Sequence, residues 1–431
     1  MSVRPMHLAI CALSALPCIA RAQSCPPEWL PGAHNLGYFG DVLSMTMWDP
    51  DAAGPQQPLL IFAGTITQAG GNVTVNRVAN FNPQTGQFAR MGVGISPGGN
   101  VVDVAVLADN SLVIAGNFPS GVKRWDGTEW VALSPGGPTL GTGVGVVTAM
   151  AVSGNHVCAV GYFNAWNGVP AAGLARWDGT AWLAFGSAPS DVYDIVIDGQ
   201  GREVTAERNF ARRFGSNAFT APVTGLNQTV NRIWSLGADR VAVTGQFSSI
   251  ASVAANRAAW FNGSTWSAMS FSSPNITFTG PVVVAPNGEV YAGGSGGVLN
   301  QHGILRFRNS QWEPFATGLN GAVSAMAVAP NGDLFVAGSF TQAANASGTL
   351  PANKLARLGY VGNCRCDPID FNNDGSLFDP TDVDAFFSVF SEGPCIPANA
   401  TCNDLDFNND GSLFDPEDVD AFFSVFSEGP C

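Results

Sequence analysis

Residues 323–338 read Val-Ser-Ala-Met-Ala-Val-Ala-Pro-Asn-Gly-Asp-Leu-Phe-Val-Ala-Gly, two apolar runs separated by a short polar segment. Asn-Gly between two such runs is a strong hairpin signal, so this stretch predicts two antiparallel strands, 323–328 and 334–338. The second run, which ends in Ala-Gly or an equivalent pair, recurs at residues 60–64, 113–116, 158–161, 204–207, 241–245 and 290–293. The last residues of successive copies are 52, 45, 46, 38, 48 and 45 positions apart. This period is typical of a four-stranded propeller blade.

Each repeat continues with a third and a fourth strand. In the third repeat, Leu174-Ala175-Arg176-Trp177 is followed by Asp178-Gly179 and by a strand that contains Trp182. The two aromatic residues that flank this second turn form a recurring pair, found as Phe81/Phe88, Trp125/Trp130, Trp177/Trp182, Phe214/Phe219, Phe261/Trp266 and Phe307/Trp312. The repeats therefore predict an all-β protein built from four-stranded antiparallel units.

The seventh repeat lacks the aromatic fourth strand after its third strand, 355–359. A matching segment stands at the other end of the chain, where Glu28-Trp29-Leu30-Pro31 resembles Gln311-Trp312-Glu313-Pro314. We therefore expect the N-terminal segment to supply the outer strand of the last blade and to close a seven-bladed ring over residues 23–363. The alternative is an open solenoid, which needs polar capping repeats at its ends.

The sequence of the repeats resembles that of known propellers. The shared phrase is Val-Ala-Gly-x-Phe, followed by Leu-Ala-Arg-Trp-Asp-Gly-x-x-Trp, as in the propeller repeats of exported bacterial proteins and of fungal cell-polarity marker proteins. It covers roughly residues 25–363. The resemblance implies the fold and leaves the activity open, because propellers host many unrelated functions.

Residues 1–22 have the features of an export signal. Arg4 and His7 precede an apolar stretch, 8–20, and Ala20-Arg21-Ala22 is a small-x-small cleavage signature. The apolar run is short for a membrane anchor, and no later run approaches the roughly 18–20 residues of a spanning helix. We expect cleavage after Ala22 and a monomeric protein, secreted or held at a bacterial cell surface, where disulfides form.

Charge is distributed unevenly along the 431 residues, which carry a formal net charge of −14. Residues 364–431 contain fifteen acidic residues and one basic residue, whereas residues 23–363 contain eighteen and sixteen. This step predicts a domain boundary near Cys364. The acidity also argues against a nucleic-acid partner, since phosphate binding requires clustered Lys and Arg.

Two segments of the acidic tail, 370–380 and 406–416, match almost letter for letter. Oxygen-bearing side chains at positions 1, 3 and 5 with Gly at 6 begin an EF-hand calcium loop, and the residue after the Gly offers its backbone carbonyl. Two copies favour two calcium ions over a metal-free turn linker. The candidate ligands are Asp370, Asn372, Asp374, Ser376, Asp379 and Asp382 in the first copy and Asp406, Asn408, Asp410, Ser412, Asp415 and Asp418 in the second.

The residue that closes each calcium loop is ambiguous. Position 12 is Thr381 in one copy and Glu417 in the other, whereas position 13 is Asp382 and its counterpart Asp418. We prefer the aspartates, because they agree between the copies. Asp379, which directly precedes Pro380, suits either a metal ligand or a helix N-cap followed by Pro at the first helical position.

A short amphipathic helix is predicted after each loop. Val383, Phe386, Phe387 and Phe390 recur at i, i+3, i+4 and i+7, and the second copy repeats this spacing from Val419 to Phe426. These apolar residues predict the core of a small domain rather than a partner surface.

The loop–helix pair resembles a type I dockerin, the calcium-dependent docking module of cellulosome enzymes, over residues 366–431. The resemblance implies a small α-helical calcium-binding domain at 364–431, and it aligns Asp370, Asn372, Asp374 and Asp382, with their counterparts in the second copy, to the family's calcium ligands. It also implies a cohesin-like or other cell-surface partner and a link to polysaccharide catabolism. The tail departs from the family pattern in three ways. Each loop has one inserted residue, cysteines flank each copy, and the positions where a dockerin contacts its cohesin hold Pro380-Thr381 and Pro416-Glu417.

Seven cysteines remain after removal of the signal. Cys366–Cys395 and Cys402–Cys431 have equal spacings in the two copies, so we pair them within each copy, where a disulfide stabilises a domain with a small core. Cys25 and Cys364 flank the predicted ring and form the third expected pair. Cys158 lies in an apolar strand and is predicted to be a free, buried thiol.

Catalytic motifs are sparse. Mature histidines are His34, His156 and His302, in different repeats, and no phosphate loop occurs. The letters Gly-x-Ser-x-Gly occur at 94–98 and 293–297, but both stretches lie in repeats predicted to be all β, whereas a nucleophile elbow joins a strand to a helix. Two features stay open as sites: the charged cluster of repeat four and the carboxylates that begin repeats and are candidates to line the central channel. The first comprises Arg202, Glu203, Glu207, Arg208, Arg212 and Arg213, and the second Asp41, Asp103 and Asp194.

The sequence favours a non-catalytic propeller that binds proteins or glycans and is docked by its calcium module. The alternative is a carbohydrate-active propeller enzyme, a glycoside hydrolase or polysaccharide lyase, with a dockerin-like appendage. Two carboxylates facing each other in one pocket would favour the enzyme.

Overall fold

The structure is a computed structural model. It describes residues 27–31, 40–52, 54–71, 73–95, 99–184, 192–207, 210–215, 218–220, 228–236, 240–255, 257–271, 276–285, 289–296, 301–308, 311–345, 348–359, 380–390 and 419. The chain divides into two units, one of residues 27–361 and one of residues 1–26 with 362–431. The described part of the first unit is almost entirely β-structure.

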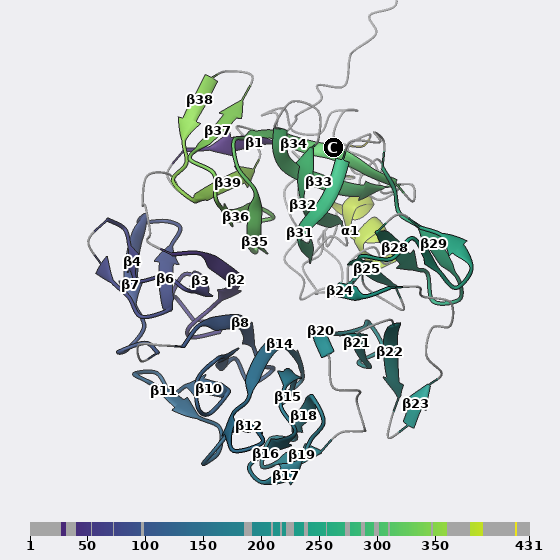
Figure 1. The fold of residues 1–431 in the computed structure, drawn as a ribbon. Helices are drawn as coiled ribbons and strands as arrows, with labels where there is room; N and C mark the ends of the chain where they lie inside the picture. Colours follow the sequence, from purple (N-terminus) through teal and green to yellow (C-terminus); the bar gives the residue numbers. More distant parts are fainter. Residues whose placement is uncertain are drawn as a thin grey trace, which may run out of the picture. The chain divides into compact units, whose positions relative to one another are not determined.

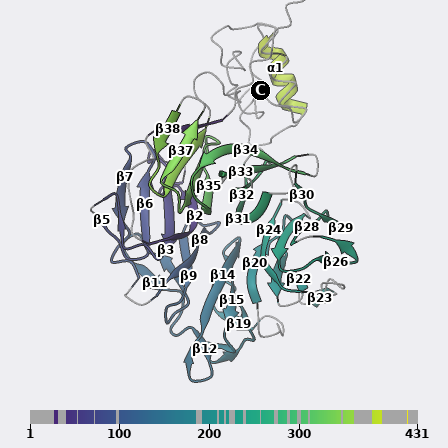
Figure 2. The ribbon, with the colours of Figure 1, turned by 45° about the horizontal axis from the view of Figure 1, so that its top comes forward.

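The first unit is built from four-stranded antiparallel meanders (Figures 1 and 2). The first four meanders consist, from the inner strand outward, of β2 (Val42–Trp48), β3 (Leu59–Gly64), β6 (Val78–Asn82) and β7 (Gln87–Arg90); β8 (Val101–Val106), β9 (Leu112–Gly116), β10 (Val122–Trp125) and β11 (Trp130–Ala132); β14 (Val146–Ser153), β15 (His156–Tyr162), β18 (Leu174–Trp177) and β19 (Trp182–Ala184); and β20 (Val192–Ile197), β21 (Glu203–Glu207), β22 (Phe210–Gly215) and β23 (Ala218–Thr220).

The remaining meanders follow the same order. They are β24 (Val230–Ser235), β25 (Val241–Gly245), β28 (Ala258–Phe261) and β29 (Trp266–Ala268); β31 (Ile276–Val284), β32 (Val290–Gly296), β33 (Gln301–Arg308) and β34 (Gln311–Leu319); and β35 (Val323–Val328), β36 (Leu334–Gly338), β39 (Leu355–Gly359) and β1 (Glu28–Leu30).

Short additional hairpins, which the sequence did not predict, are inserted before several third strands. They are β4 (Gln68–Ala69) with β5 (Val73–Thr74), β16 (Ala165–Trp166) with β17 (Val169–Pro170), β26 (Ser249–Ile250) with β27 (Val253–Ala254), and β37 (Gln342–Asn345) with β38 (Gly348–Pro351). A further hairpin, β12 (Pro138–Leu140) with β13 (Gly143–Val144), extends the β16 hairpin to four strands, and β30 (Ser270–Phe271) pairs in parallel with β34.

The inner strands form a closed ring. Each inner strand contacts the next one along the chain, from β2 through β8, β14, β20, β24 and β31 to β35, and β35 in turn contacts β2 (Figure 1). Apolar clusters fill the space between neighbouring meanders; one of them joins Phe62 and Phe81 of the first meander to Phe335 of the last. The protein is therefore a β-propeller.

The predicted ring closure is confirmed. β1 pairs antiparallel with β39, the third strand of the last meander, and Trp29 lies opposite Leu358. The predicted aromatic pairs are also confirmed as cross-strand neighbours; Trp125 and Trp130, for example, have ring centroids 5.2 Å apart. Such pairs stabilise the outer hairpin of each meander.

The recurring Gly that ends the second strand has a steric cause. A Cβ atom on Gly116 would lie 2.0 Å from the carbonyl oxygen of Asn100, the residue before β8. The next residue, Asn117, donates its N–H to that same oxygen at 2.9 Å. Gly64, Gly161, Gly245 and Gly338 are in the same situation, with distances of 1.9–2.1 Å. The Ala-Gly motif therefore marks the place where the chain before an inner strand crosses the second strand.

Helix α1 (Pro380–Phe390) is the helix of the second unit that the structure describes in full. It begins at Pro380, as predicted from Pro at the first helical position. Ala385 and Phe386 are fully buried, whereas Phe387 is 44% exposed. The predicted apolar stripe is therefore only partly covered by the residues around it. The described residues include no helix long and apolar enough to cross a membrane.

Candidate functional site

Of the carboxylates that begin repeats and are candidates to line the central channel, Asp103 and Asp194 lie on inner strands. In β2, β8, β14, β20, β24 and β35 the pairing register shifts near the first residues of the strand, for instance between Val101 and Asp103 in β8 and between Val192 and Asp194 in β20. In β31 the shift comes later, between Phe278 and Val282. Such a bulge re-aims the side chains that follow it. We refer to the residue directly after the shift as the junction residue.

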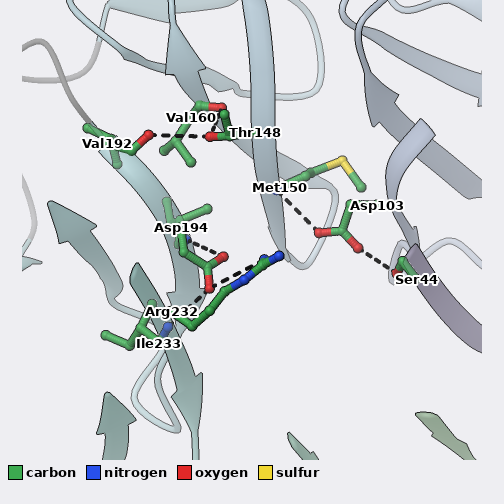
Figure 3. A network of polar contacts seen from close by, with 10 residues as sticks. Ser44, Asp103, Thr148, Met150, Val160, Val192, Asp194, Arg232 and Ile233 are labelled. Atoms are coloured by element: carbon green, nitrogen blue, oxygen red, sulfur yellow. Dashed lines mark hydrogen bonds and ion pairs between the residues drawn. The ribbon is translucent and has the colours of Figure 1, made fainter. Parts of the chain in front are cut away.

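Asp103 is the junction residue of β8, and both of its carboxylate oxygens are engaged. Oδ1 accepts a hydrogen bond from the hydroxyl of Ser44, on β2, at 2.7 Å. Oδ2 accepts from the backbone N–H of Met150, on β14, at 3.3 Å (Figure 3). Burial raises the pKa of Asp103, although these hydrogen bonds and the positive charge of Arg232 oppose the increase. This carboxylate therefore links three consecutive meanders.

Asp194 is the junction residue of β20 and has a corresponding role. Its Oδ2 accepts from the backbone N–H of Ile233, on β24, at 3.0 Å and lies 4.0 Å from the guanidinium of Arg232. Burial raises the pKa of Asp194 to about 6, and repulsion from Asp103 adds to the increase. The Arg232 side chain, 62% exposed, extends from Asp194 towards Asp103 (Figure 3).

Two other junctions use a hydroxyl donor in place of a carboxylate acceptor. The hydroxyl of Thr148, on β14, donates to the carbonyl oxygen of Val192, on β20, at 3.3 Å. The hydroxyl of Ser324, on β35, donates to the carbonyl oxygen of Val42, on β2, at 2.7 Å. In these two strands the junction residue is an alanine, Ala149 or Ala325, whose side chain has no polar atom. The residue before it, Thr148 or Ser324, therefore makes the contact to the neighbouring meander.

The arrangement holds neighbouring meanders together. Sequence reasoning selected Asp103 and Asp194 and missed Ser44, Thr148, Arg232 and Ser324, although each lies one or two residues after a Val at the start of an inner strand.

Asp41, the third predicted carboxylate, does not lie on an inner strand. It precedes β2, its side chain is 73% exposed, and it lies 4.0 Å from the ammonium group of Lys354.

The described charges of repeat four pair within the propeller. Arg202 contacts Asp198 at 2.9 Å. Glu203, only 6% exposed, lies 3.5 Å from Arg176 of the preceding meander. Glu207 is fully buried at the position that Gly occupies in other repeats, and the hydroxyl of Thr205 donates to it at 2.8 Å. Arg208 and the side chains of Arg212 and Arg213 lie outside the described residues.

Cys158 is a free, buried thiol, as predicted. Its Sγ lies 3.6 Å from Oε1 of Glu203. Burial and the negative charge of Glu203 raise the pKa of the thiol. Arg176 contacts both Glu203 and Nδ1 of His156, the latter at 2.9 Å. This cluster connects the third and fourth meanders and holds the thiol in its protonated, unreactive form.

The predicted calcium ligands lie outside the described residues. This applies to Asp370, Asn372, Asp374, Ser376 and Asp379, to Asp406, Asn408, Asp410, Ser412, Asp415 and Asp418, and to the side chain of Asp382. The predicted disulfide partners Cys25, Cys364, Cys366, Cys395, Cys402 and Cys431 also lie outside them. Among the described residues, no group of three or more His, Cys, Asp or Glu residues is placed to hold a metal ion.

Comparison with known proteins gives similarities in structure only. No protein-family model matches the chain, and no curated protein matches it in sequence. The WD40 β-propeller domain of Doa1 is 12% identical over 75% of this chain and 93% of that domain, with a TM-score of 0.48.

Two further structures are similar at the same level. A streptogramin B lyase is 13% identical over 76% of this chain and 97% of the lyase, with a TM-score of 0.47. The extracellular domain of a hybrid two-component system from B. thetaiotaomicron is 11% identical over 79% of this chain and 41% of that one, also with a TM-score of 0.47. At these values the assignment of the fold rests on the strand pairing and ring contacts of the protein itself.

Proposed function

We propose that the protein is an exported, non-catalytic binding protein that combines a seven-bladed propeller with a calcium-dependent docking module. The propeller presents a surface for protein or glycan ligands, and the tail attaches the protein to a partner or to the cell surface. One observation carries the non-catalytic assignment. Asp103 and Asp194, the two carboxylates of the described inner strands, accept hydrogen bonds from the backbone of the following meander. Their oxygens stabilise the ring and are not directed at a substrate.

The calcium assignment is supported by the duplicated loop sequence and by α1. Asp370, Asn372 and Asp374 have the spacing of the first three ligands of a calcium loop, and Gly375 stands where the loop turns sharply. Helix α1 then begins at Pro380, directly after this segment. We propose that Ser376, Asp379 and Asp382 complete the first site and that Asp406, Asn408, Asp410, Ser412, Asp415 and Asp418 form the second. Both sites are of the weak extracellular class, with dissociation constants on the order of 10⁻⁴ to 10⁻³ M or somewhat tighter.

Calorimetry on the full mature chain tests the calcium sites. After removal of metal by a chelator, titration with CaCl₂ should give two binding events. The double substitution Asp370→Ala and Asp406→Ala, which removes the first ligand of each loop, should abolish both. Asp384→Asn is the matched control, because Asp384 is an exposed acidic residue of α1 outside the loop. The assignment would be contradicted if the wild-type chain bound no calcium, or if the double variant bound calcium as tightly as the wild-type chain.

The binding function is tested separately. The full chain is screened against a glycan array and in pull-down experiments from culture supernatant, with and without calcium. We expect a ligand that the double variant still binds through the propeller. Release of new reducing ends or unsaturated sugars from a polysaccharide by the purified chain would favour the carbohydrate-active enzyme instead.

A further inference from the structure

The strand that closes the ring differs from every other outer strand in how it is held. The other described outer strands follow their partners through a short turn, such as the one in which Oδ1 of Asp126 accepts the N–H groups of Thr128 and Glu129 at 2.8 and 2.7 Å. β1 has no such turn, because its partner β39 lies more than 300 residues away in sequence. Its connection within the ring is the segment 31–41, which leads to β2.

Side-chain contacts replace the missing turn. The amide of Asn345, on β37, forms two hydrogen bonds with the backbone of Trp29: Oδ1 accepts from its N–H and Nδ2 donates to its carbonyl oxygen, both at 2.8 Å. The indole N–H of Trp29 donates to the carbonyl oxygen of Thr317, on β34, at 2.8 Å. In contrast, the buried indole N–H of Trp130, the corresponding residue of the second meander, has no hydrogen-bond partner.

The geometry is that of a peptide-binding slot. The outer edge of β39, which β1 occupies, offers a ladder of three residue pairs, from Arg357 to Gly359. Asn345 recognises the backbone of the central residue, and a pocket between the last two meanders encloses its indole, which is 2% exposed. A main-chain ladder combined with one deep side-chain pocket is how sheet edges recognise extended peptides.

We propose that this edge, with Asn345 and Thr317, is a strand-acceptor site that recognises a Trp-centred strand independently of its covalent connection, and that the partner it fits is β1 of a second copy. An exchanged strand makes the same contacts in the slot as the chain's own strand, which is the energetic basis of domain swapping. The segment 31–41 spans on the order of 35 Å when extended, enough to reach a neighbouring molecule.

Peptide complementation tests the site. Trp29→Ala in the mature chain empties the pocket, and the peptide Pro-Pro-Glu-Trp-Leu-Pro, residues 26–31, is added in trans. At a peptide concentration ten times its dissociation constant, the unfolding midpoint should rise by about 2–4 °C. A peptide with Ala in place of Trp should give no increase, and neither should the double variant Trp29→Ala and Asn345→Ala. Trp29→Phe serves if the Ala variant does not fold.

A matched control comes from a hairpin-tethered strand. Trp130→Ala should gain much less from a peptide of residues 127–132, because the short turn of its hairpin keeps the truncated strand on its edge at a higher effective concentration than the longer segment 31–41 gives β1. The second copy is tested with the wild-type chain under reducing conditions, so that the expected Cys25–Cys364 bond does not hold β1 to its own ring; the chain is concentrated and held a few degrees below its midpoint. Light scattering should then detect a dimer that Trp29→Ala and Asn345→Ala do not form. If the peptide fails to stabilise folded Trp29→Ala, the acceptor site is wrong; if the peptide binds but no Trp29-dependent dimer forms, the second copy as partner is wrong.

Discussion

Replacement of Asp194 by Asn tests how much stability the ring loses when the buried carboxyl of Asp194 becomes charged. Asn retains an oxygen that accepts the N–H of Ile233 but removes the charge. Because burial raises the pKa of Asp194 to about 6, the folded protein binds this proton more tightly than the unfolded chain. The resulting stability is fully present below about pH 4 and is lost as the pH rises through about 6. The interval between these pKa values corresponds to on the order of 3 kcal/mol.

We therefore expect Asp194→Asn to become more stable relative to wild type as the pH increases from 4 to 8, by up to about 3 kcal/mol. Urea unfolding followed by tryptophan fluorescence measures this difference, since all 11 tryptophans lie between residues 29 and 312 and report on the propeller alone. Asp109→Asn is the control with the opposite sign, because the hydroxyl of Ser111 lowers the pKa of Asp109. A difference between Asp194→Asn and wild type that does not change with pH would refute the reasoning.

Three further predictions concern the backbone and the thiol. Lys354 has a φ of 65°, so Lys354→Ala should be less stable than Lys354→Gly by about 1 kcal/mol in thermal unfolding. Gly116→Ala forces a Cβ to within 2.0 Å of the carbonyl of Asn100 and should cost more than about 2 kcal/mol, whereas Gly127→Ala, with φ 103° and open space around it, should cost about 1 kcal/mol; equal costs would contradict the steric explanation. Cys158, buried and with a raised pKa, should react with a thiol reagent only at the rate of unfolding, and fast labelling of the folded chain would show that it is accessible.

The repeats were predictable from sequence because their signals are local. An Asn-Gly turn between apolar runs and an aromatic pair across the second turn each depend on fewer than ten neighbouring residues. The N-terminal closure was predictable as well, because the residues around Trp29 in the sequence resemble those around Trp312. Both tryptophans are buried, and a side chain of this size has few places where it can be buried.

The contacts between meanders were not predictable in the same way. Whether Ser44 donates to a carboxylate depends on the residue at the same position of the next repeat, Asp103, 59 residues away. The anchoring of Trp29 by Asn345 depends on a hairpin, β37–β38, inserted in one repeat at a place where others carry different hairpins. Such contacts depend on how neighbouring repeats pack against each other, and the sequence pattern of a single repeat carries no information about that packing.

The two parts of the chain neutralise their carboxylates differently, and this difference is the physical reason to expect a cation in the tail. Residues 23–363 hold eighteen acidic and sixteen basic residues, and arginines on several third strands pair with acidic residues near the turn between the first two strands. These pairs are Arg124 with Asp109, Arg306 with Glu289, and Arg357 with Asp333. Residues 364–431 hold fifteen acidic residues and one basic residue. This segment therefore has too few basic side chains to pair with its carboxylates in the same way. Carboxylates brought together by folding repel one another unless a cation joins them. A chelator should therefore destabilise the tail and leave the tryptophan-reported unfolding of the propeller unchanged.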